Sequence, residues 1–355
     1  MSENMQINSH GNNAFDFLRV FAGSAVLYSH SYALYGLPEP VPVSGQTYGS
    51  LAVALFFSIS GFLVCQSWVR DPSFLRFFFR RILRIFPGLI VVVILTSLLI
   101  GPIFTTLKLD QYFSSGTAWS YIWQAALTLD SPPLKGVFES NPYPGAPNGS
   151  LWTLRYEILM YAALAVCGML VPKSKLQYLC PIMAVVFGAT WLVASYSNLT
   201  PIKVPFVWRL HTEFYGERIA YLGAFFFAGA TMHFHFQRIP LSGWFATLLG
   251  VAALLATDSI VAMVLLWVAL PYVAIVFAFK APILFRKING ADYSYGIYIY
   301  AFPIQQSVSL IGNQLGWSWL AVLFIASGIT ITLAGASWYC IEKPALSLKD
   351  LLVKS

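Results

Sequence analysis

Charged side chains are scarce in this sequence. Asp, Glu, Lys and Arg together make up 10% of its 355 residues, whereas hydrophobic residues make up 58% and aromatic residues 16%. A soluble globule of this size needs more polar side chains than this to cover its surface. The composition therefore excludes a large soluble enzyme and indicates a membrane protein.

Cysteine and histidine are also rare, with four and five residues in the chain. Cys65, Cys167, Cys180 and Cys340 show neither close pairing nor metal-like spacing, so we interpret them as buried thiols and expect no metal site. The sequence contains no G-x-S-x-G, Walker or H-E-x-x-H motif. The candidate functional residues are therefore the ionisable side chains in and near the hydrophobic segments described next.

Ten apolar segments follow one another along the chain, each of roughly 20 residues and long enough to cross a hydrocarbon core about 30 Å thick. They cover residues 14–36, 49–68, 86–107, 151–171, 177–196, 215–235, 241–257, 260–279, 291–311 and 317–338. The sequence thus predicts an all-α polytopic membrane protein with about ten transmembrane helices.

Lysine and arginine are unevenly distributed between the two sides that this topology defines. With the N-terminus inside, fourteen of the 21 basic residues lie in cytoplasmic segments, four lie in outer loops, and three lie in or at the edge of spans. Cytoplasmic loops carry such a positive excess, so we expect both termini in the cytoplasm. Short basic loops also account for the net charge of +7, and we expect no nucleic acid partner.

The predicted organisation is a cytoplasmic tail over 1–13, a membrane domain over 14–340 and a cytoplasmic tail over 341–355. The external loop 108–150 contains an amphipathic helix around 118–129 and ends in a run rich in turn-forming residues. A long loop of this kind is either a lid or binding element, or a passive connector.

The first span contains two ionisable groups that require an explanation. Arg19 and His30 are eleven residues apart, which places them on one helix face and about 16 Å apart along it. Ionisable groups within a bilayer usually face a bundle interior and mark a functional route. His30 is the best candidate for proton transfer, and the alternative is a structural histidine. Asp16 precedes Arg19 by three residues, so the two can form an ion pair that either anchors the helix or belongs to an anion site.

Two further clusters carry candidate binding residues. The stretch Arg76-Phe77-Phe78-Phe79-Arg80-Arg81-Ile82-Leu83-Arg84 places guanidinium groups among aromatic rings at the cytoplasmic surface. Arg80, Arg81 and Arg84 suit the phosphates of a nucleotide-bearing ligand, although positive-inside anchoring explains them equally. At the start of the fourth span, Trp152, Arg155 and Glu157 are candidates to bind or orient a substrate.

Six short motifs occur in an order that resembles the acyltransferase 3 family of membrane-bound acyltransferases, from about Phe15 to Pro344. They are the Arg19 to His30 pair, Phe56-Phe57-Ser58-Ile59-Ser60-Gly61-Phe62-Leu63, Arg81-Ile82-Leu83-Arg84-Ile85-Phe86-Pro87, Ser150-Leu151-Trp152-Thr153-Leu154-Arg155-Tyr156-Glu157, Ser294-Tyr295-Gly296-Ile297-Tyr298-Ile299-Tyr300 and Ile341-Glu342-Lys343-Pro344. One departure is Tyr300-Ala301-Phe302-Pro303, because the family often has Trp-His before this Phe-Pro.

The resemblance implies transfer of an acyl group, commonly acetyl, from cytosolic acyl-coenzyme A to a hydroxyl of an exported glycan such as O-antigen or exopolysaccharide. It implies a multi-pass protein of a bacterial inner membrane, in contact with membrane lipids. The essential residues of the family correspond to Arg19 and His30, and its coenzyme-binding arginines correspond to Arg81 and Arg84. Ser60, Gly61 and Glu342 belong to the structural motifs.

The sequence leaves the mechanism and one other class of function open. His30 either deprotonates the acceptor hydroxyl or takes the acyl group itself. Asp16 or Glu157 orients a partner or binds the acceptor. Intramembrane charges would serve a transporter or flippase of a lipid-linked or small polar substrate equally well.

Overall fold

The computed structural model describes residues 13–43, 45–196, 203–207, 212–286 and 291–349. Most of the predicted tails, residues 1–12 and 350–355, lies outside this description. The same holds for Arg209, Lys287 and Lys354, which contribute to the predicted orientation.

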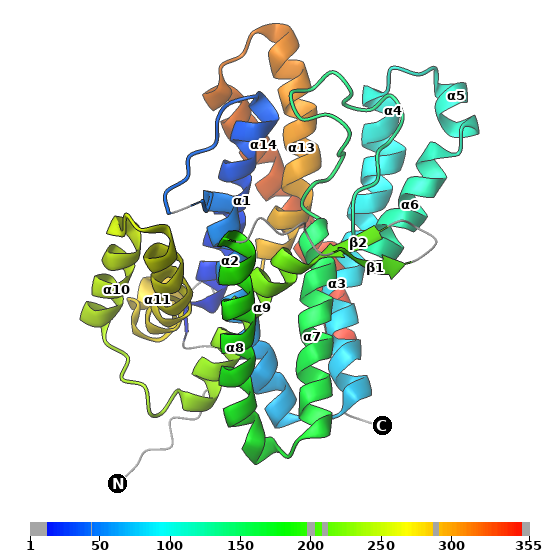
Figure 1. The fold of residues 1–355 in the computed structure, drawn as a ribbon. Helices are drawn as coiled ribbons and strands as arrows, with labels where there is room; N and C mark the ends of the chain where they lie inside the picture. Colours follow the sequence, from blue (N-terminus) through cyan, green and yellow to red (C-terminus); the bar gives the residue numbers. More distant parts are fainter. Residues whose placement is uncertain (1–12, 44, 197–202, 208–211, 287–290, 350–355) are drawn as a thin grey trace.

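Helices occupy all ten apolar segments that the sequence predicts (Figure 1). In the described part of the chain they are α1 (Phe15–Tyr35), α2 (Tyr48–Arg70), α3 (Phe74–Leu95), α7 (Trp152–Leu170), α8 (Lys173–Tyr196), α9 (Gly216–His235), α10 (Gly243–Leu255), α11 (Ser259–Lys280), α13 (Ser294–Leu315) and α14 (Trp319–Ser337). The helical prediction is therefore confirmed for each segment.

Two of these helices continue through a π-helical turn into a short further helix. The turn Thr96–Ile100 joins α3 to α4 (Gly101–Phe104), which makes one rod of 31 residues. The turn Trp338–Glu342 joins α14 to α15 (Lys343–Ser347), which makes a second rod of 29 residues.

Six helices among the described residues are long and apolar enough to cross a membrane: α2, the α3–α4 rod, α7, α8, α11 and the α14–α15 rod. Helix α10 has only 13 residues and is too short. Helices α1, α9 and α13 are long enough, but they carry more polar side chains. Helix α1 packs against both α2 and α13, and its Ser29 and Ser31 hydroxyls accept hydrogen bonds from Gly49 of α2 and Trp319 of α14.

The outer surface of the bundle is apolar, as expected for a protein in contact with lipid. Large side chains such as Leu170 and Phe324 are exposed, and Trp244 is 86% exposed. Inside, α2 and α9 approach closely at two glycines. A Cβ atom on Gly61 would lie 1.8 Å from the Phe226 carbonyl oxygen, and one on Gly229 would lie 2.0 Å from the Ser58 carbonyl oxygen. Glycine is thus required at both positions for this contact.

One described element departs from the predicted all-helical fold. Between α8 and α9, the short strand β1 (Lys203–Val207) pairs antiparallel with β2 (Thr212–Tyr215). A short helix, α12 (Ile283–Arg286), follows α11.

The predicted external loop is a structured region that contains α5 (Leu109–Ser114) and α6 (Thr117–Thr128). Helix α6 confirms that the segment predicted around 118–129 is helical. The Ser97 hydroxyl of the first π-helical turn donates a hydrogen bond to the Ala118 carbonyl at 2.7 Å, and the Tyr112 hydroxyl donates to the Ser97 carbonyl at 2.7 Å. Both hydrogen bonds attach this region to the α3–α4 rod.

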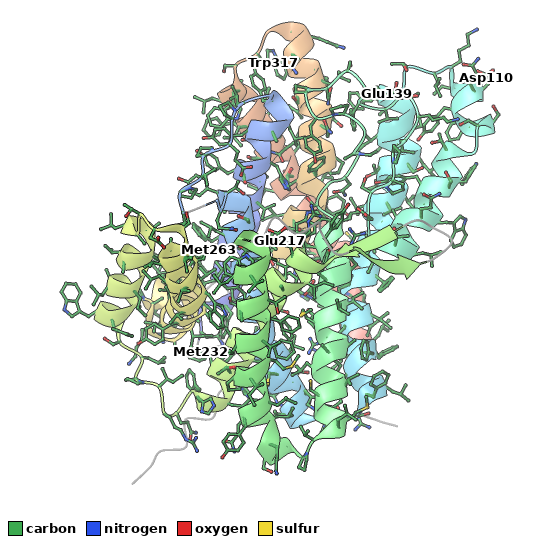
Figure 2. The ribbon with its side chains drawn as sticks, viewed as in Figure 1. Asp110, Glu139, Glu217, Met232, Met263 and Trp317 are labelled. Atoms are coloured by element: carbon green, nitrogen blue, oxygen red, sulfur yellow. The ribbon has the colours of Figure 1, made fainter. Side chains whose placement is uncertain are left out.

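The molecule has two ends that differ in composition. We call the end with the starts of α3 and α8 the basic end, because it carries Arg76, Arg80, Lys173 and Lys175. We call the opposite end, formed by α5, α6 and the segment 129–151, the loop end. Figure 2 shows Asp110 and Glu139 there, together with Trp317 after α13. Helix α1 begins nearer the basic end and runs toward the loop end (Figure 1).

A candidate site of buried arginines and a separate histidine

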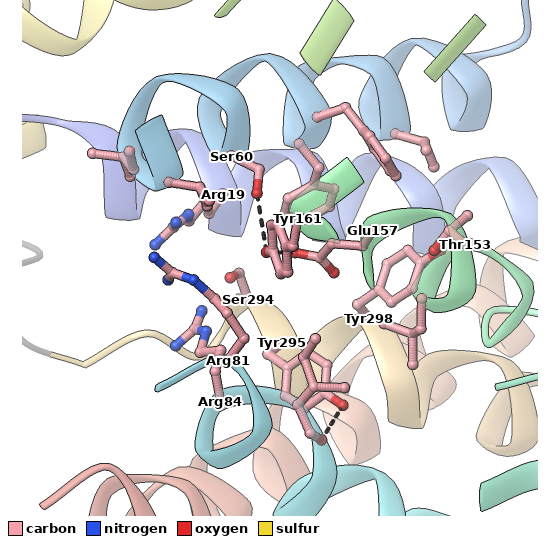
Figure 3. Close-up of a pocket in the computed structure, with 17 residues that line it drawn as sticks. Arg19, Ser60, Arg81, Arg84, Thr153, Glu157, Tyr161, Ser294, Tyr295 and Tyr298 are labelled. Atoms are coloured by element: carbon pink, nitrogen blue, oxygen red, sulfur yellow. Dashed lines mark hydrogen bonds between the residues drawn. The ribbon is translucent and has the colours of Figure 1, made fainter. Parts of the chain in front are cut away.

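A cavity of about 110 Å³ lies between α1, α2, α3, α7 and α13 (Figure 3). Its volume is sufficient for several water molecules. Its polar lining consists of Arg19, Ser60, Arg81, Arg84, Thr153, Glu157, Tyr161, Ser294, Tyr295 and Tyr298. We call it the arginine cavity, because the guanidinium groups of its three arginines point toward one another (Figure 3).

Two of the three arginines share one carboxylate. Asp292, just before α13, accepts a hydrogen bond at its Oδ2 from Arg19 Nη1 at 3.1 Å and another from Arg84 Nη2. Ser294 holds the other oxygen through its hydroxyl and, at 3.2 Å, through its backbone N–H. Asp16 is only a secondary partner of Arg19, at 3.8 Å. Asp292 is 6% exposed, so the two guanidinium groups compensate the cost of burying its charge.

Arg81 has no such partner. Its Nε and Nη2 atoms are buried and form no hydrogen bond with any described residue. Its guanidinium lies 5.1 Å from the Phe77 ring centroid and 5.4 Å from that of Tyr161, within the range of cation–π attraction. Arg81 is therefore a cation in the cavity wall that retains hydrogen-bond donors for a ligand.

Arg80 is directed away from this cavity. Its Nη2 donates to Asp71, and its Nε donates to the Arg76 carbonyl at 3.0 Å. Asp71 also accepts two hydrogen bonds from Arg76, which together with Arg80 hold the pKa of this carboxyl below its usual value. The structure thus separates Arg80 from Arg81 and Arg84, although the sequence places all three on one helix.

Hydroxyl groups form two hydrogen-bonded sets among the other polar residues of the cavity. The Tyr161 hydroxyl donates to Glu157 Oε1 and lies 3.1 Å from the Ser60 hydroxyl (Figure 3). Nearer the start of α7, the hydroxyls of Thr153 and Tyr298 are 2.6 Å apart. Glu157 and Ser60 therefore belong to the same site as the arginines.

His30 is not among the residues that line the arginine cavity. Its ring packs edge-to-face on Phe302, with the ring centroids 5.1 Å apart and the planes at 78°. Its Nδ1 atom is buried and has no hydrogen-bond partner among the described residues. Tyr298 of the cavity lining precedes Phe302 by about one helical turn on α13, so this helix connects the cavity with the histidine.

Trp152 and Arg155 also lie outside the cavity. Arg155 is 4% exposed, and its Nη1 donates to Asp130 Oδ2 at 2.7 Å. The Trp152 ring has the Arg218 guanidinium 4.5 Å from its centroid. Arg155 thus links α7 to the segment 129–151, and Trp152 packs against α9.

Glu342 lies in the second π-helical turn and is 2% exposed. Its Oε1 accepts a hydrogen bond from the Ser337 hydroxyl at 2.7 Å. Within the described ranges, the structure shows no group of three or more His, Cys, Asp or Glu side chains that could hold a metal ion.

Sequence reasoning missed Asp292, the main partner of Arg19 and Arg84. The two partners of the Arg19 ion pair are 273 positions apart in the chain. The available signal was a single acidic residue at the start of the ninth apolar segment, two positions before the Ser294-Tyr295-Gly296 motif. A lone acidic residue at a span end carries little information until its neighbours in space are known.

Two curated proteins are similar to this chain over almost its whole length. One is the O-acetyl transferase of Shigella phage Sf6, with 31% identity over 344 residues that cover 95% of this chain and 97% of the relative. The other is nodulation protein 10 of Rhizobium leguminosarum bv. viciae, with 29% identity over 379 residues that cover 99% and 97%. No solved structure matches the chain. The acyltransferase domain that defines the acyltransferase 3 family matches residues 12–340, and this chain therefore belongs to that family.

Proposed function

We propose that this protein moves an acyl group, acetyl in the first instance, from acyl-coenzyme A to a hydroxyl of a glycan. Membership of the acyltransferase 3 family and the similarity to a phage protein named O-acetyl transferase support the reaction class. The observation that carries the donor assignment is Arg81, a buried guanidinium in a cavity wall with two unpaired nitrogens.

The proposed arrangement has ten membrane-spanning helices over 14–340 in a bacterial inner membrane. The basic end and both tails, 1–13 and 341–355, face the cytoplasm, and the region 108–150 faces outward. The distribution of Lys and Arg supports this orientation. The donor then enters from the basic end, where coenzyme A is available, and the acceptor reaches His30 from the loop end.

In the proposed donor complex, phosphate or carbonyl oxygens of acyl-coenzyme A take the free donors of Arg81. Asp292 holds Arg19 and Arg84 in fixed positions beside it. Guanidinium groups bind phosphate oxygens with two parallel hydrogen bonds, which a lysine cannot do. Ser60, Glu157 and Tyr161 would orient the amide groups of the pantetheine arm.

The thioester must reach His30 beyond the cavity. Tyr298 at the cavity wall and Phe302 beside His30 lie on the route along α13. His30 would take the proton of the acceptor hydroxyl while its oxygen bonds to the thioester carbonyl carbon. The carbon–sulfur bond then breaks, and the thiolate of coenzyme A takes a proton. In the alternative form, His30 accepts the acyl group first.

Acyl transfer can be tested with purified protein in lipid nanodiscs and [14C]acetyl-coenzyme A. We expect release of coenzyme A that depends on an added glycan, with the label recovered on that glycan. Glycan transport without chemistry, the alternative that the sequence leaves open, would give no release of coenzyme A. Mass spectrometry of envelope glycans from cells with and without the gene would then identify the acceptor.

A further inference from the structure

Buried polar atoms without partners gather around His30, outside the arginine cavity. Gln305 of α13 is 2% exposed. Its Nε2 donates to the Leu27 carbonyl of α1 at 2.8 Å, whereas its Oε1 has no partner among the described residues. Leu27 precedes His30 by three residues and Phe302 precedes Gln305 by three. His30 therefore lies beside both Phe302 and Gln305, and its own Nδ1 is also unpaired.

The segment 129–151 covers the same part of α13 from the loop end. Asn141 Nδ2 donates to the Gln306 backbone oxygen at 3.0 Å and to its Oε1 at 2.6 Å. Gln306 Nε2 donates to the carbonyls of Tyr143 at 2.8 Å and Ala146 at 3.1 Å. The Phe302 ring contacts both His30 and Tyr143, with centroids 5.1 and 5.9 Å apart. The segment is thus fixed to α13 next to His30.

Asn141 repeats the pattern of Gln305. It is 5% exposed, and both of its side-chain hydrogen bonds use Nδ2. Its side-chain oxygen Oδ1 has no partner among the described residues. Buried polar atoms are usually paired, because an unpaired one costs free energy. The three unpaired atoms belong to His30, which contacts Phe302, to Gln305 on the same helix, and to Asn141, which bonds the adjacent Gln306. They therefore indicate a ligand that supplies hydrogen-bond donors. We call His30, Asn141, Phe302, Gln305 and Gln306 the His30 site.

The chemistry of these atoms defines the class of ligand. Amide oxygens accept hydrogen bonds, and a neutral imidazole nitrogen can do the same. None of the five residues of the His30 site is Asp, Glu, Lys or Arg. The complementary group is an uncharged ligand rich in hydroxyl groups rather than a phosphate or a carboxylate.

We propose that the His30 site binds a neutral sugar unit of the acceptor, with Gln305 and Asn141 accepting hydrogen bonds from its hydroxyls. The reacting hydroxyl then gives its proton to His30. The segment 129–151 forms the wall of this site and selects the glycan. This inference rests on the proposed function, because it assigns the acceptor half of that reaction.

Two pairs of variants test the assignment, and each pair contains its own control. Gln305→Leu removes an unpaired acceptor together with a hydrogen bond to α1. Ser309→Ala removes only a hydrogen bond from α13 to α1, since the Ser309 hydroxyl donates to the Leu34 carbonyl at 2.7 Å. Asn141→Ala removes the other unpaired acceptor together with the two hydrogen bonds from Asn141 Nδ2 to Gln306. Asn148→Ala removes a hydrogen bond from the same segment to the Ile299 carbonyl at 2.9 Å, and the Asn148 oxygen already accepts from Ser150 N.

The measurement is initial-rate transfer of [14C]acetyl from acetyl-coenzyme A to the methyl glycosides of glucose, galactose and mannose. We expect Gln305→Leu and Asn141→Ala each to raise the acceptor KM by about tenfold or more, while the donor KM changes less than about twofold. Ser309→Ala and Asn148→Ala should leave both constants within about twofold. If the Gln305 variant fails to fold, the Asn141 pair decides, because Asn141 lies outside the helices.

The outcomes separate this inference from the proposed function. An unchanged acceptor KM in the Gln305 and Asn141 variants, or equal losses in the controls, overturns the inference. A wild-type protein that consumes acetyl-coenzyme A but acylates none of the three glycosides also contradicts a neutral sugar site. A wild-type protein that neither binds nor consumes acetyl-coenzyme A contradicts the proposed function itself.

Discussion

The arginine cavity and the His30 site lie along the same two helices but differ in charge. The cavity gathers Arg19, Arg81 and Arg84, balanced in part by Asp292. The His30 site has only an imidazole, amides and an aromatic ring as its side chains. The charged arginine cavity suits the phosphates of a donor, and the uncharged His30 site suits the hydroxyls of an acceptor. Helices α1 and α13 therefore contribute to a charged site near one end and to an uncharged site farther along.

The sharpest test of this division is His30→Ala. We expect the turnover number to fall by at least about 100-fold, because a positioned acid or base contributes rate factors of that size. Coenzyme A affinity should stay within about twofold of wild type, since His30 does not line the cavity. Transfer kinetics and equilibrium binding of coenzyme A measure the two effects.

His233→Ala is the matched control, because His233 also has a buried, unpaired Nδ1 and packs edge-to-face on a phenylalanine, Phe62, at 5.3 Å. It should retain transfer. Equal loss in both variants would show that the effect of the His30 change is structural.

At the cavity, Arg81→Gln should raise the donor KM by about tenfold or more. Charge-assisted hydrogen bonds contribute about 1.5–3 kcal/mol, and each 1.4 kcal/mol corresponds to about a factor of ten. The acceptor KM should not change. Arg80→Gln provides the control, because Arg80 pairs with Asp71 away from the cavity. Similar donor KM values for the two variants would contradict donor binding by Arg81 and would favour a membrane-anchoring role for it.

A smaller and opposite effect on donor affinity is expected for Asp292→Asn. Loss of this carboxylate leaves Arg19 and Arg84 uncompensated, so coenzyme A should bind roughly two- to fivefold more tightly. Turnover should fall, because the two guanidinium groups lose their fixed positions. Isothermal titration of coenzyme A measures the affinity, and transfer kinetics measure the turnover.

The same Asp292 variant should unfold at a lower temperature, because breaking a buried ion pair costs about 3–5 kcal/mol. A variant that is less stable and also binds coenzyme A more weakly would contradict the proposed role. Asp292→Glu should restore part of the turnover.

Much of the fold could be predicted from the sequence, because the signals are local. Apolar runs located all ten helices, and the helix predicted around 118–129 corresponds to α6. The sequence grouped Arg80, Arg81 and Arg84 as candidates for one phosphate site, and the structure brings only Arg81 and Arg84 to the cavity. The short hairpin of β1 and β2 was missed, since β1 and nearly all of β2 lie between the predicted spans that end at 196 and begin at 215.

The sequence was sufficient to locate the helices, to identify a membrane protein, and to place Arg19 and His30 on one helix, α1. Each of these follows from periodicity and hydropathy within about 20 residues. The folded arrangement was needed to show that Asp292 pairs with Arg19 and Arg84 and that Arg80 turns away from Arg81. It was also needed to show that Phe302 packs on His30 and that Asn141 bonds Gln306 next to Gln305. These contacts join residues far apart in the chain or depend on what each helix face packs against, and neither is recorded in local sequence.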